Sequence, residues 1–182
     1  QKEIAVGEKK TSRKSIYKVS DNLFRFWFRF ISDAKPLIEH ELYEEVYSSM
    51  IEPFLSHYAG GIFEEVCIQY LKRLNGKELL PFTFFKIGRW WGSNKAKKRE
   101  EEIDILAVDN NSNALIGECK WRNEKMDLDV VRELMNKGSQ LQYEKKFYVL
   151  FSKSGFSDAV IAFAKEHPEI ICIKLSDMAK LL

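Results

Sequence analysis

The hydrophobic pattern of the first sixty residues predicts helices after a polar start. Residues 1–14 are polar and basic and predict a loose arm or an incomplete wing, and "SIYKVS" then alternates like a short strand. "SDNLFRFWFRFI" has apolar residues at the helical period, with Ser20 or Asp21 as the candidate cap. Because its apolar positions cover two sides, we expect this helix to be buried on most of its circumference. Residues 37–58 predict one or two further helices, broken at Pro53.

The small residues "AGG" at positions 59–61 predict a boundary, and "IFEEVCIQYLKRLN" predicts the helix that follows it. On a helical wheel, Glu64 lies at the edge of the apolar face, whereas Glu65 points away from it. Gly60 and Gly61 are interpreted as an ordinary turn rather than as a phosphate-binding loop. Glu64 is therefore the inward-facing carboxylate of this helix.

Strands and helices alternate along the rest of the chain. The pattern predicts strands at "FTFFKIGRWW", "IDILAVD", "ALIGECKW", "KFYVLF" and "IICIKL", and helices at "DLDVVRELMNKGSQL" and "SDAVIAFAKEH". The turn "NNSN" joins the second and third strands into a hairpin, and "GSNKAKKREEE" precedes them as a charged loop. A helix between two strands usually makes a right-handed crossover between parallel neighbours. We therefore expect an α/β fold with a mixed sheet flanked by helices.

Composition narrows the class of protein. A chain of 182 residues with 45% hydrophobic residues is long enough for a sizeable core, and its net charge of +2 neither requires nor excludes a nucleic-acid partner. The three cysteines are scattered without a CxxC pair, which disfavours a disulfide framework or a zinc site and indicates a reducing compartment. Because there is neither a long apolar stretch nor a signal peptide, we expect no membrane association and a cytoplasmic location.

The strand "IGECKW" carries two charges in an otherwise apolar run. Glu118 and Lys120 are two positions apart, so they lie on one face of the strand together with Ile116. In the preceding strand, strict alternation places Asp104 on one face with Glu102, Leu106 and Val108, and places Ile103, Ile105 and Ala107 on the other.

The register of the hairpin decides whether these charges meet. Asp104 meets Glu118 and Lys120 only if the numbers of opposed residues sum to an even value. A loop of three or five residues, or a bulge, gives that register, whereas a loop of two or four residues places Cys119 there instead.

Two carboxylates and a lysine that converge in this way suit a hard divalent cation. Mg²⁺ is commonly held by one or two carboxylates together with waters and phosphate oxygens, so we expect Asp104 and Glu118 to bind Mg²⁺ or Mn²⁺. Lys120 would orient or deprotonate a water, or stabilise the oxygens of the transition state. Without a cation the two carboxylates would repel, and one would tend to take up a proton.

A basic segment leads into the first strand of the hairpin. We expect Lys95, Lys97, Lys98 and Arg99 to bind a phosphate backbone, with Arg89, Trp90 and Trp91 extending that surface. The alternative is a solvated loop whose charges are balanced by residues 100–102. Of the two tryptophans, we expect one to pack in the core and the other to be exposed.

These motifs resemble those of the PD-(D/E)XK nuclease superfamily. "IDIL" supplies the aspartate Asp104, thirteen residues separate it from "ECK", and the "GGIFEEV" helix resembles the opening helix of that superfamily. The resemblance makes Glu64 the counterpart of the helical glutamate. The chain departs from the named pattern because Ile103 stands at the proline position.

A closer resemblance covers most of the chain. "SRKSIYKVSDNLFRFWFRFI", "GIFEEV", "IGRWW", "EEIDILAVD", "GECKW" and "LFSKSGFSDA" resemble the C-terminal region of the archaeal ATPases, which join a P-loop ATPase and a winged helix to a nuclease-like domain. The resemblance implies a winged-helix remnant and helical connector over residues 1–58 and a restriction-endonuclease-like domain over residues 59–182. No G-x-x-x-x-G-K-[ST] motif occurs in the sequence, so no ATPase site of that kind is expected here.

The resemblance implies a function and leaves one alternative open. The first expectation is metal-dependent hydrolysis of DNA by an accessory domain of an ATPase, with Asp104, Glu118, Lys120 and Glu64 as the catalytic residues. The alternative is a catalytically inactive module that binds DNA or protein and regulates or assembles the ATPase, because a fold by itself does not determine activity.

Overall fold

The computed structural model describes residues 2–9, 11, 15–94 and 99–180, without the side chains of Asn94 and Arg99. The chain divides into two compact units. The first unit contains residues 1–4 and 8–59, and the second contains residues 5–7 and 60–182. The dividing point between Ala59 and Gly60 lies within one long helix. Each unit has its own buried residues, so the two are described separately.

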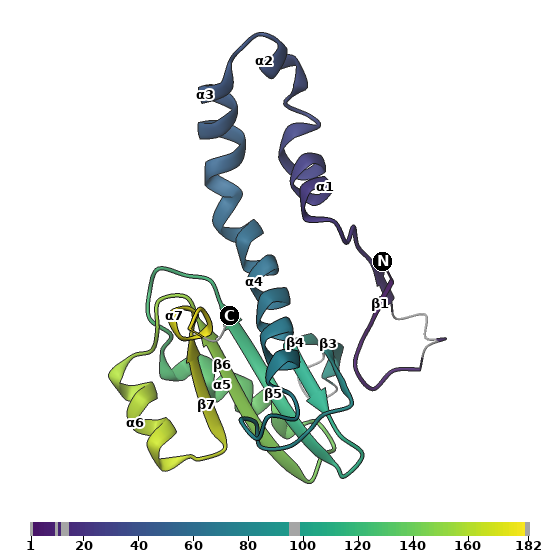
Figure 1. The fold of residues 1–182 in the computed structure, drawn as a ribbon, viewed down its shortest axis with the longest axis vertical. Coiled ribbons are helices and arrows are strands. Elements are labelled where there is room, and N and C mark those ends of the chain that lie inside the picture. Colours follow the sequence, from purple (N-terminus) through teal and green to yellow (C-terminus); the bar gives the residue numbers. More distant parts are fainter. Residues whose placement is uncertain (1, 10, 12–14, 95–98, 181–182) are drawn as a thin grey trace. The chain divides into compact units, whose positions relative to one another are not determined.

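The first unit combines a short hairpin with helices (Figure 1). Its strands β1 (Lys2–Ile4) and β2 (Ser15–Tyr17) pair antiparallel. Its helical elements are α1 (Asn22–Phe26), the π-helical η1 (Trp27–Ile31), α2 (Lys35–Glu39), α3 (Tyr43–Val46), the π-helical η2 (Tyr47–Ile51) and the start of α4 (Glu52–Leu74). The Asp21 side chain accepts a hydrogen bond of 3.0 Å from the amide of Phe24, which confirms Asp21 as the cap of α1.

Two predicted interruptions of the helical region are wrong. α4 begins at Glu52 and continues through Pro53, Gly60 and Gly61 to Leu74. Pro53 lies directly after η2, whose wider i→i+5 hydrogen bonds already depart from the α-helical pattern that proline disrupts. The two glycines are tolerated because the tertiary packing of the helix outweighs their low helical propensity. The break instead falls before Tyr43, where Glu41 adopts φ +61°.

The aromatic helix is also more exposed than predicted. Leu23, Phe24, Trp27 and Phe28 have exposed fractions of 72%, 55%, 40% and 63%, whereas Phe30 on the other side is only 2% exposed. The helical period of the apolar residues is present, but within its own unit only the Phe30 side is covered. The expectation of burial on most of the circumference is therefore wrong.

The second unit contains a five-stranded mixed sheet (Figure 1). Its strand order is β3-β4-β5-β6-β7, with antiparallel pairs from β3 to β5 and parallel pairs from β5 to β7, which confirms the predicted mixed sheet. The strands are β3 (Lys86–Asn94), β4 (Arg99–Val108), β5 (Asn113–Lys120), β6 (Lys145–Ser152) and β7 (Ile170–Lys174). The helices that follow β5, β6 and β7 are α5 (Leu128–Ser139), α6 (Asp158–Glu166) and α7 (Leu175–Met178).

Helices cover both faces of this sheet. The part of α4 that belongs to the second unit packs on one face, where Phe63, Cys67 and Leu71 are buried against Ile105. α5 and α6 pack on the opposite face through apolar side chains that include Val131, Leu134 and Val160. None of the described helices is long and apolar enough to cross a membrane.

The β4–β5 hairpin has the even register that the candidate site requires. Ile105 pairs with Gly117 and Val108 pairs with Ala114, so opposed residue numbers sum to 222. Asp109 fixes the turn because its carboxylate accepts hydrogen bonds of 2.8 Å and 2.9 Å from the amides of Asn111 and Asn113. Such a side-chain-capped turn leaves a short loop and determines the register of the strands beyond it.

Alternation along β4 breaks at a bulge. Gly88 pairs with Leu106 but Trp90 pairs with Ile103, so two residues of β4, Asp104 and Ile105, oppose the single residue Arg89 of β3. Ile103 therefore packs with Leu106 on the α5 face, while Ile105 packs on the α4 face. The prediction that Ile103 shares a face with Ile105, opposite Leu106, is wrong because it assumed strict alternation.

The segment predicted as a charged loop is in part a strand. β3 continues to Asn94 and β4 begins at Arg99, so residues 100–102 are paired with β3. Glu101 is buried, and the side chain of Gln140 donates a hydrogen bond of 3.2 Å to its carboxylate. Trp90 packs against the core on the α5 face, and Trp91 is half-buried rather than exposed.

Candidate functional site

Asp104 lies where the β4–β5 ladder ends. Ile105–Gly117 is the last residue pair of that ladder. Asp104 immediately precedes Ile105 in the chain and is the first residue of the bulge. The Asp104 carboxylate accepts a hydrogen bond of 2.8 Å from the backbone amide of Cys119. The Asp104 side chain thus takes the place of a backbone carbonyl of β4 as the acceptor for the Cys119 amide. The bulge turns the carboxylate toward β5.

Gly117 allows the two strands to approach at this point. A Cβ atom on Gly117 would lie 2.8 Å from Cβ of Ile105 and 2.9 Å from Cγ1 of Val149. Because Ile105 and Val149 are fully buried β-branched side chains, these atoms have little room to move. Residue 117 must therefore be small for Asp104 and Glu118 to be held in this arrangement.

Glu118 is a buried carboxylate held by two lysines. Its side chain is only 8% exposed, and each of its oxygens is paired with a different ammonium group. Lys120 pairs with Oε1, and Nζ of Lys137, from α5, lies 3.4 Å from Oε2. A buried carboxylate needs such partners, since isolated charges are costly to remove from water.

Glu64 approaches the same site from α4. The guanidinium of Arg89, on β3, lies with Nε 3.5 Å from the Glu64 carboxylate and also pairs with Glu102. Arg89 is the residue opposite the bulge, so the feature that redirects Asp104 also places Arg89 beside Glu64.

The electrostatics of the site show that its carboxylates crowd one another. The pKa of Glu64 is raised from 4.5 to about 7, mainly by burial and next by the charge of Asp104, against the opposing effect of Arg89. Burial also raises the pKa of Asp104 from 3.8 to about 6, with the charge of Glu118 as the second cause. The Cys119 amide and the nearby lysines oppose that rise. Excess negative charge of this kind favours a bound cation.

The donor set fits a hard divalent cation that keeps part of its hydration shell. Among the residues that the structure describes, no group of three or more His, Cys, Asp and Glu side chains is placed to hold a metal ion. A cation here would have Asp104 and Glu118 as its protein ligands, with water or phosphate oxygens in the other positions. This coordination is typical of Mg²⁺ and Mn²⁺ rather than of zinc.

The structure brings four predicted residues together and separates others from them. These residues are Glu64 from α4, Asp104 from β4, and Glu118 and Lys120 from β5. The charges of Asp104 and Glu118 raise the pKa of Glu64. Glu118 raises and Lys120 lowers the pKa of Asp104. Arg89 lies beside these carboxylates and pairs with Glu64 and Glu102, and its role in binding nucleic acid stays a prediction. Lys95, Lys97 and Lys98 lie outside the described residues, and only the backbone of Arg99 is described.

Lys137 is a site residue that the sequence analysis missed. It follows the buried residue Leu134 by three positions and precedes the buried Gly138, so it lies on the inward side of α5. This spacing was available in the sequence. Its distance of seventeen positions from Lys120 gave no reason to connect it with "ECK".

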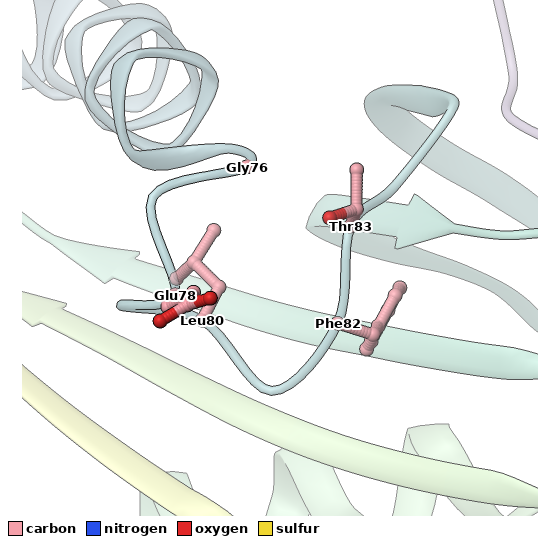
Figure 2. Close-up of a pocket in the computed structure, with 5 residues that line it drawn as sticks. All are labelled: Gly76, Glu78, Leu80, Phe82 and Thr83. Atoms are coloured by element: carbon pink, nitrogen blue, oxygen red, sulfur yellow. The ribbon is translucent and has the colours of Figure 1, made fainter.

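A surface hollow near the end of α4 is separate from this site. Figure 2 shows that it is formed by the connection between α4 and β3, and it has a volume of about 400 Å³. Its lining residues are Gly76, Glu78, Leu80, Phe82 and Thr83. None of the four clustered site residues lines it, and it offers one carboxylate and no cationic side chain. We assign it no function.

The three cysteines form no disulfide, and one of them, Cys119, adjoins the site through its neighbour Glu118. Cys67, Cys119 and Cys172 are free cysteines. Burial raises the pKa of Cys119 well above its ordinary value, and the neighbouring Cys67 raises it further. A thiol in this environment packs as a small apolar group.

Comparisons with known proteins identify the family. The model of the DUF234 family, described as archaeal and bacterial proteins of unknown function, matches residues 27–132, which include Glu64, Asp104, Glu118 and Lys120. The uncharacterized protein MJECL04 of Methanocaldococcus jannaschii is 34% identical over 159 residues, covering 84% of this chain and 34% of that protein. The chain thus spans about a third of the length of that relative. No solved structure gives a significant match. Because the family model covers more than half of the sequence, the chain belongs to the DUF234 family.

Proposed function

We propose that this protein hydrolyses DNA phosphodiesters with Mg²⁺ or Mn²⁺, on a restriction-endonuclease-like domain formed by residues 59–182. The observation that carries the proposal is the convergence of Glu64, Asp104, Glu118 and Lys120 at the end of the β4–β5 ladder. Their spacing in the sequence resembles that of the PD-(D/E)XK nucleases, and their chemistry suits a phosphodiester and a divalent cation.

Each residue has a role that its environment supports. Asp104 and Glu118 would bind the cation, which supplies water activation and neutralises charge on the phosphate. Lys120, held beside Glu118, would orient the attacking water or stabilise the transition-state oxygens. Glu64 would act as a second carboxylate or an outer ligand, and its raised pKa allows it to hold a proton near neutral pH.

The wider setting of the activity is also part of the proposal. The resemblance to archaeal ATPases suggests an accessory domain that works with an ATPase of the same chain or of partner subunits, in the cytoplasm. The M. jannaschii relative, about three times as long as the matched region, has room for such a domain. Residues 1–58 would then be a winged-helix remnant and connector.

The test is cleavage of plasmid and branched DNA with Mg²⁺ or Mn²⁺. We expect cleavage by the wild-type protein and its loss in Asp104→Ala and Lys120→Ala. The matched controls are Asp129→Ala and Lys125→Ala, which remove the same charges at exposed positions. Absence of cleavage across both metals and all DNA forms, in a protein that is folded, would refute the proposal.

One observation favours a second function. Both oxygens of Glu118 are paired with lysines, and such internal neutralisation also suits a non-catalytic site. In this case the domain binds DNA or protein and regulates or assembles the ATPase. Its DNA binding would be sensitive to salt, survive Asp104→Ala and fall when Lys95, Lys97, Lys98 and Arg99 are neutralised. Binding that persists after charge reversal of those residues would count against this function.

A further inference from the structure

Lys137 is an internal cation of the candidate site. Its side chain is 15% exposed, less than that of Lys120 at 24%, and its ammonium nitrogen lies 3.4 Å from Oε2 of Glu118. Its charge also acts on Asp104, so it is close to both predicted metal ligands. Removing a lysine from water is costly unless its charge is paired. The partner of Lys137 is Glu118, the carboxylate that is also expected to bind the divalent cation.

A divalent cation and Lys137 have conflicting demands on Glu118. Mg²⁺ binds carboxylate oxygens at about 2.0–2.1 Å, closer than an ammonium group approaches them. Two like-charged groups on one buried carboxylate repel strongly, because the surroundings screen them less than water does. Lys120 already occupies the other oxygen. A cation at Glu118 would be a third positively charged group on a carboxylate that already holds two ammonium groups, which favours displacement of one of them.

The charge of the site indicates where Lys137 would go. The cluster contains four carboxylates, from Glu64, Glu102, Asp104 and Glu118, against three cationic groups, from Arg89, Lys120 and Lys137. A bound divalent cation favours the ionised form of all four carboxylates, and the seven charges then sum to −1, or to +1 with the cation included. One phosphodiester group of charge −1 restores neutrality. An ammonium group released from Glu118 would have an oxygen of the substrate phosphate as a new anionic partner.

We propose that Lys137 competes with the divalent cation for Glu118 and, once displaced, contacts the phosphate of the DNA substrate. Its flexible four-carbon stem lets the ammonium group move while α5 stays in place. Lys137 thus couples cation binding to DNA binding. This inference rests on the proposed function, because it takes Asp104 and Glu118 as the cation ligands.

The experiment compares Lys137→Met with Arg132→Met, which removes the same charge from an exposed position of α5. Calorimetry measures Mn²⁺ binding without DNA, and fluorescence anisotropy measures DNA binding in Ca²⁺ or in EDTA. We expect Lys137→Met to bind Mn²⁺ about three- to tenfold more tightly, because a competing charge is gone. In Ca²⁺ its DNA affinity falls about fivefold, and the slope of log affinity against log salt decreases by about one. In EDTA it matches Arg132→Met.

Further variants separate this role from a structural one. Lys137→Arg keeps the charge and should retain DNA binding, and Lys137→Gln repeats the test if Lys137→Met has a lowered melting temperature. If Lys137 only held Glu118 in position, its removal would weaken Mn²⁺ binding instead of strengthening it. Weaker Mn²⁺ binding in Lys137→Met would therefore overturn the inference. DNA binding in Ca²⁺ equal to that of Arg132→Met would also overturn it.

The design distinguishes failure of this inference from failure of the proposed function. If wild-type protein binds Mn²⁺ and Asp104→Ala abolishes that binding, the proposed cation site stands, and the Lys137 variants alone decide the inference. If neither wild-type protein nor Lys137→Met binds Mn²⁺, the proposed cation site fails and the inference fails with it.

Discussion

At the scale of single residues, environment rather than residue type determines the chemistry of the carboxylates. Glu118 is buried and paired with two lysines, whereas Glu64 is half-buried near Asp104 and has a raised pKa. Glu101 is buried and accepts a hydrogen bond from Gln140. A sequence identifies all of these residues as glutamate or aspartate, but burial and neighbouring charge determine which of them hold a proton.

Glu64 should make stability depend on pH. Its folded pKa of about 7 exceeds the ordinary 4.5, so the folded state binds the proton more tightly than the unfolded state does. The free energy of unfolding therefore falls as pH rises from 4.5 to about 7 and stays lowered above that range. Glu64→Gln should remove this loss, and urea denaturation should show it more stable than wild type at pH 8 by the order of 1–2 kcal/mol.

At pH 4 the two proteins should be nearly equal in stability, because Glu64 is then protonated in both states. Glu65→Gln changes the neighbouring glutamate of α4 and serves as the control. If Glu64→Gln shows the same pH profile as wild type, the raised pKa is wrong.

At the scale of secondary-structure elements, the bulge in β4 and the register of the hairpin build the site together. The sequence showed that Asp104 and Glu118 can meet only if the hairpin has an even register, and the structure has that register. The bulge was not derivable, since it depends on pairing with β3, which lies more than ten positions earlier. It places Ile103 and Ile105 on opposite faces and brings Asp104 to the Cys119 amide.

Gly117→Ala should destabilise the protein. Its Cβ atom would clash with Ile105 and Val149 at less than 3 Å, and both side chains are fully buried. We expect the free energy of unfolding to fall by about 1–3 kcal/mol, measured by urea denaturation.

Gly61→Ala is the matched substitution with the opposite expected sign. No atom lies within 4 Å of its Cβ position, and the residue is in the interior of α4. Alanine should stabilise the helix by about 0.5–1 kcal/mol. A loss of stability in this variant, or none in Gly117→Ala, would contradict the packing described here.

At the scale of the whole molecule, the chain forms two units with different amounts of internal burial. The second unit buries apolar side chains on both faces of its sheet. The first has few fully buried side chains, among them Phe30, Ala34 and Val46, and it exposes much of an aromatic helix. Helical periodicity predicts which residues share a face, but it carries no information about whether another part of the molecule covers that face.

Two phenylalanines of that helix should respond differently to truncation. Phe30→Ala should lower the free energy of unfolding of the first unit by roughly 3 kcal/mol, because the ring is 2% exposed and packs against Phe26 and Tyr58. Phe28→Ala should change it by less than about 0.5 kcal/mol, because that ring is 63% exposed.

Trp27 fluorescence during urea denaturation provides the measurement, in a variant with the other three tryptophans replaced by phenylalanine. Equal losses for the two substitutions would show that the Phe28 side of the helix is buried after all.

The sequence alone determined the order of the five strands and of α5 and α6 in the second unit, two candidate caps for α1, and the shared strand face of Glu118 and Lys120. These features depend on local periodicity and on neighbours a few positions apart, which a single sequence displays. The tertiary structure decided the uninterrupted course of α4, the bulge at Asp104, the place of Arg89 beside Glu64, and the arrival of Lys137 at Glu118. Each of these depends on contacts between segments far apart in the chain, where the packing of neighbouring elements outweighs local preference.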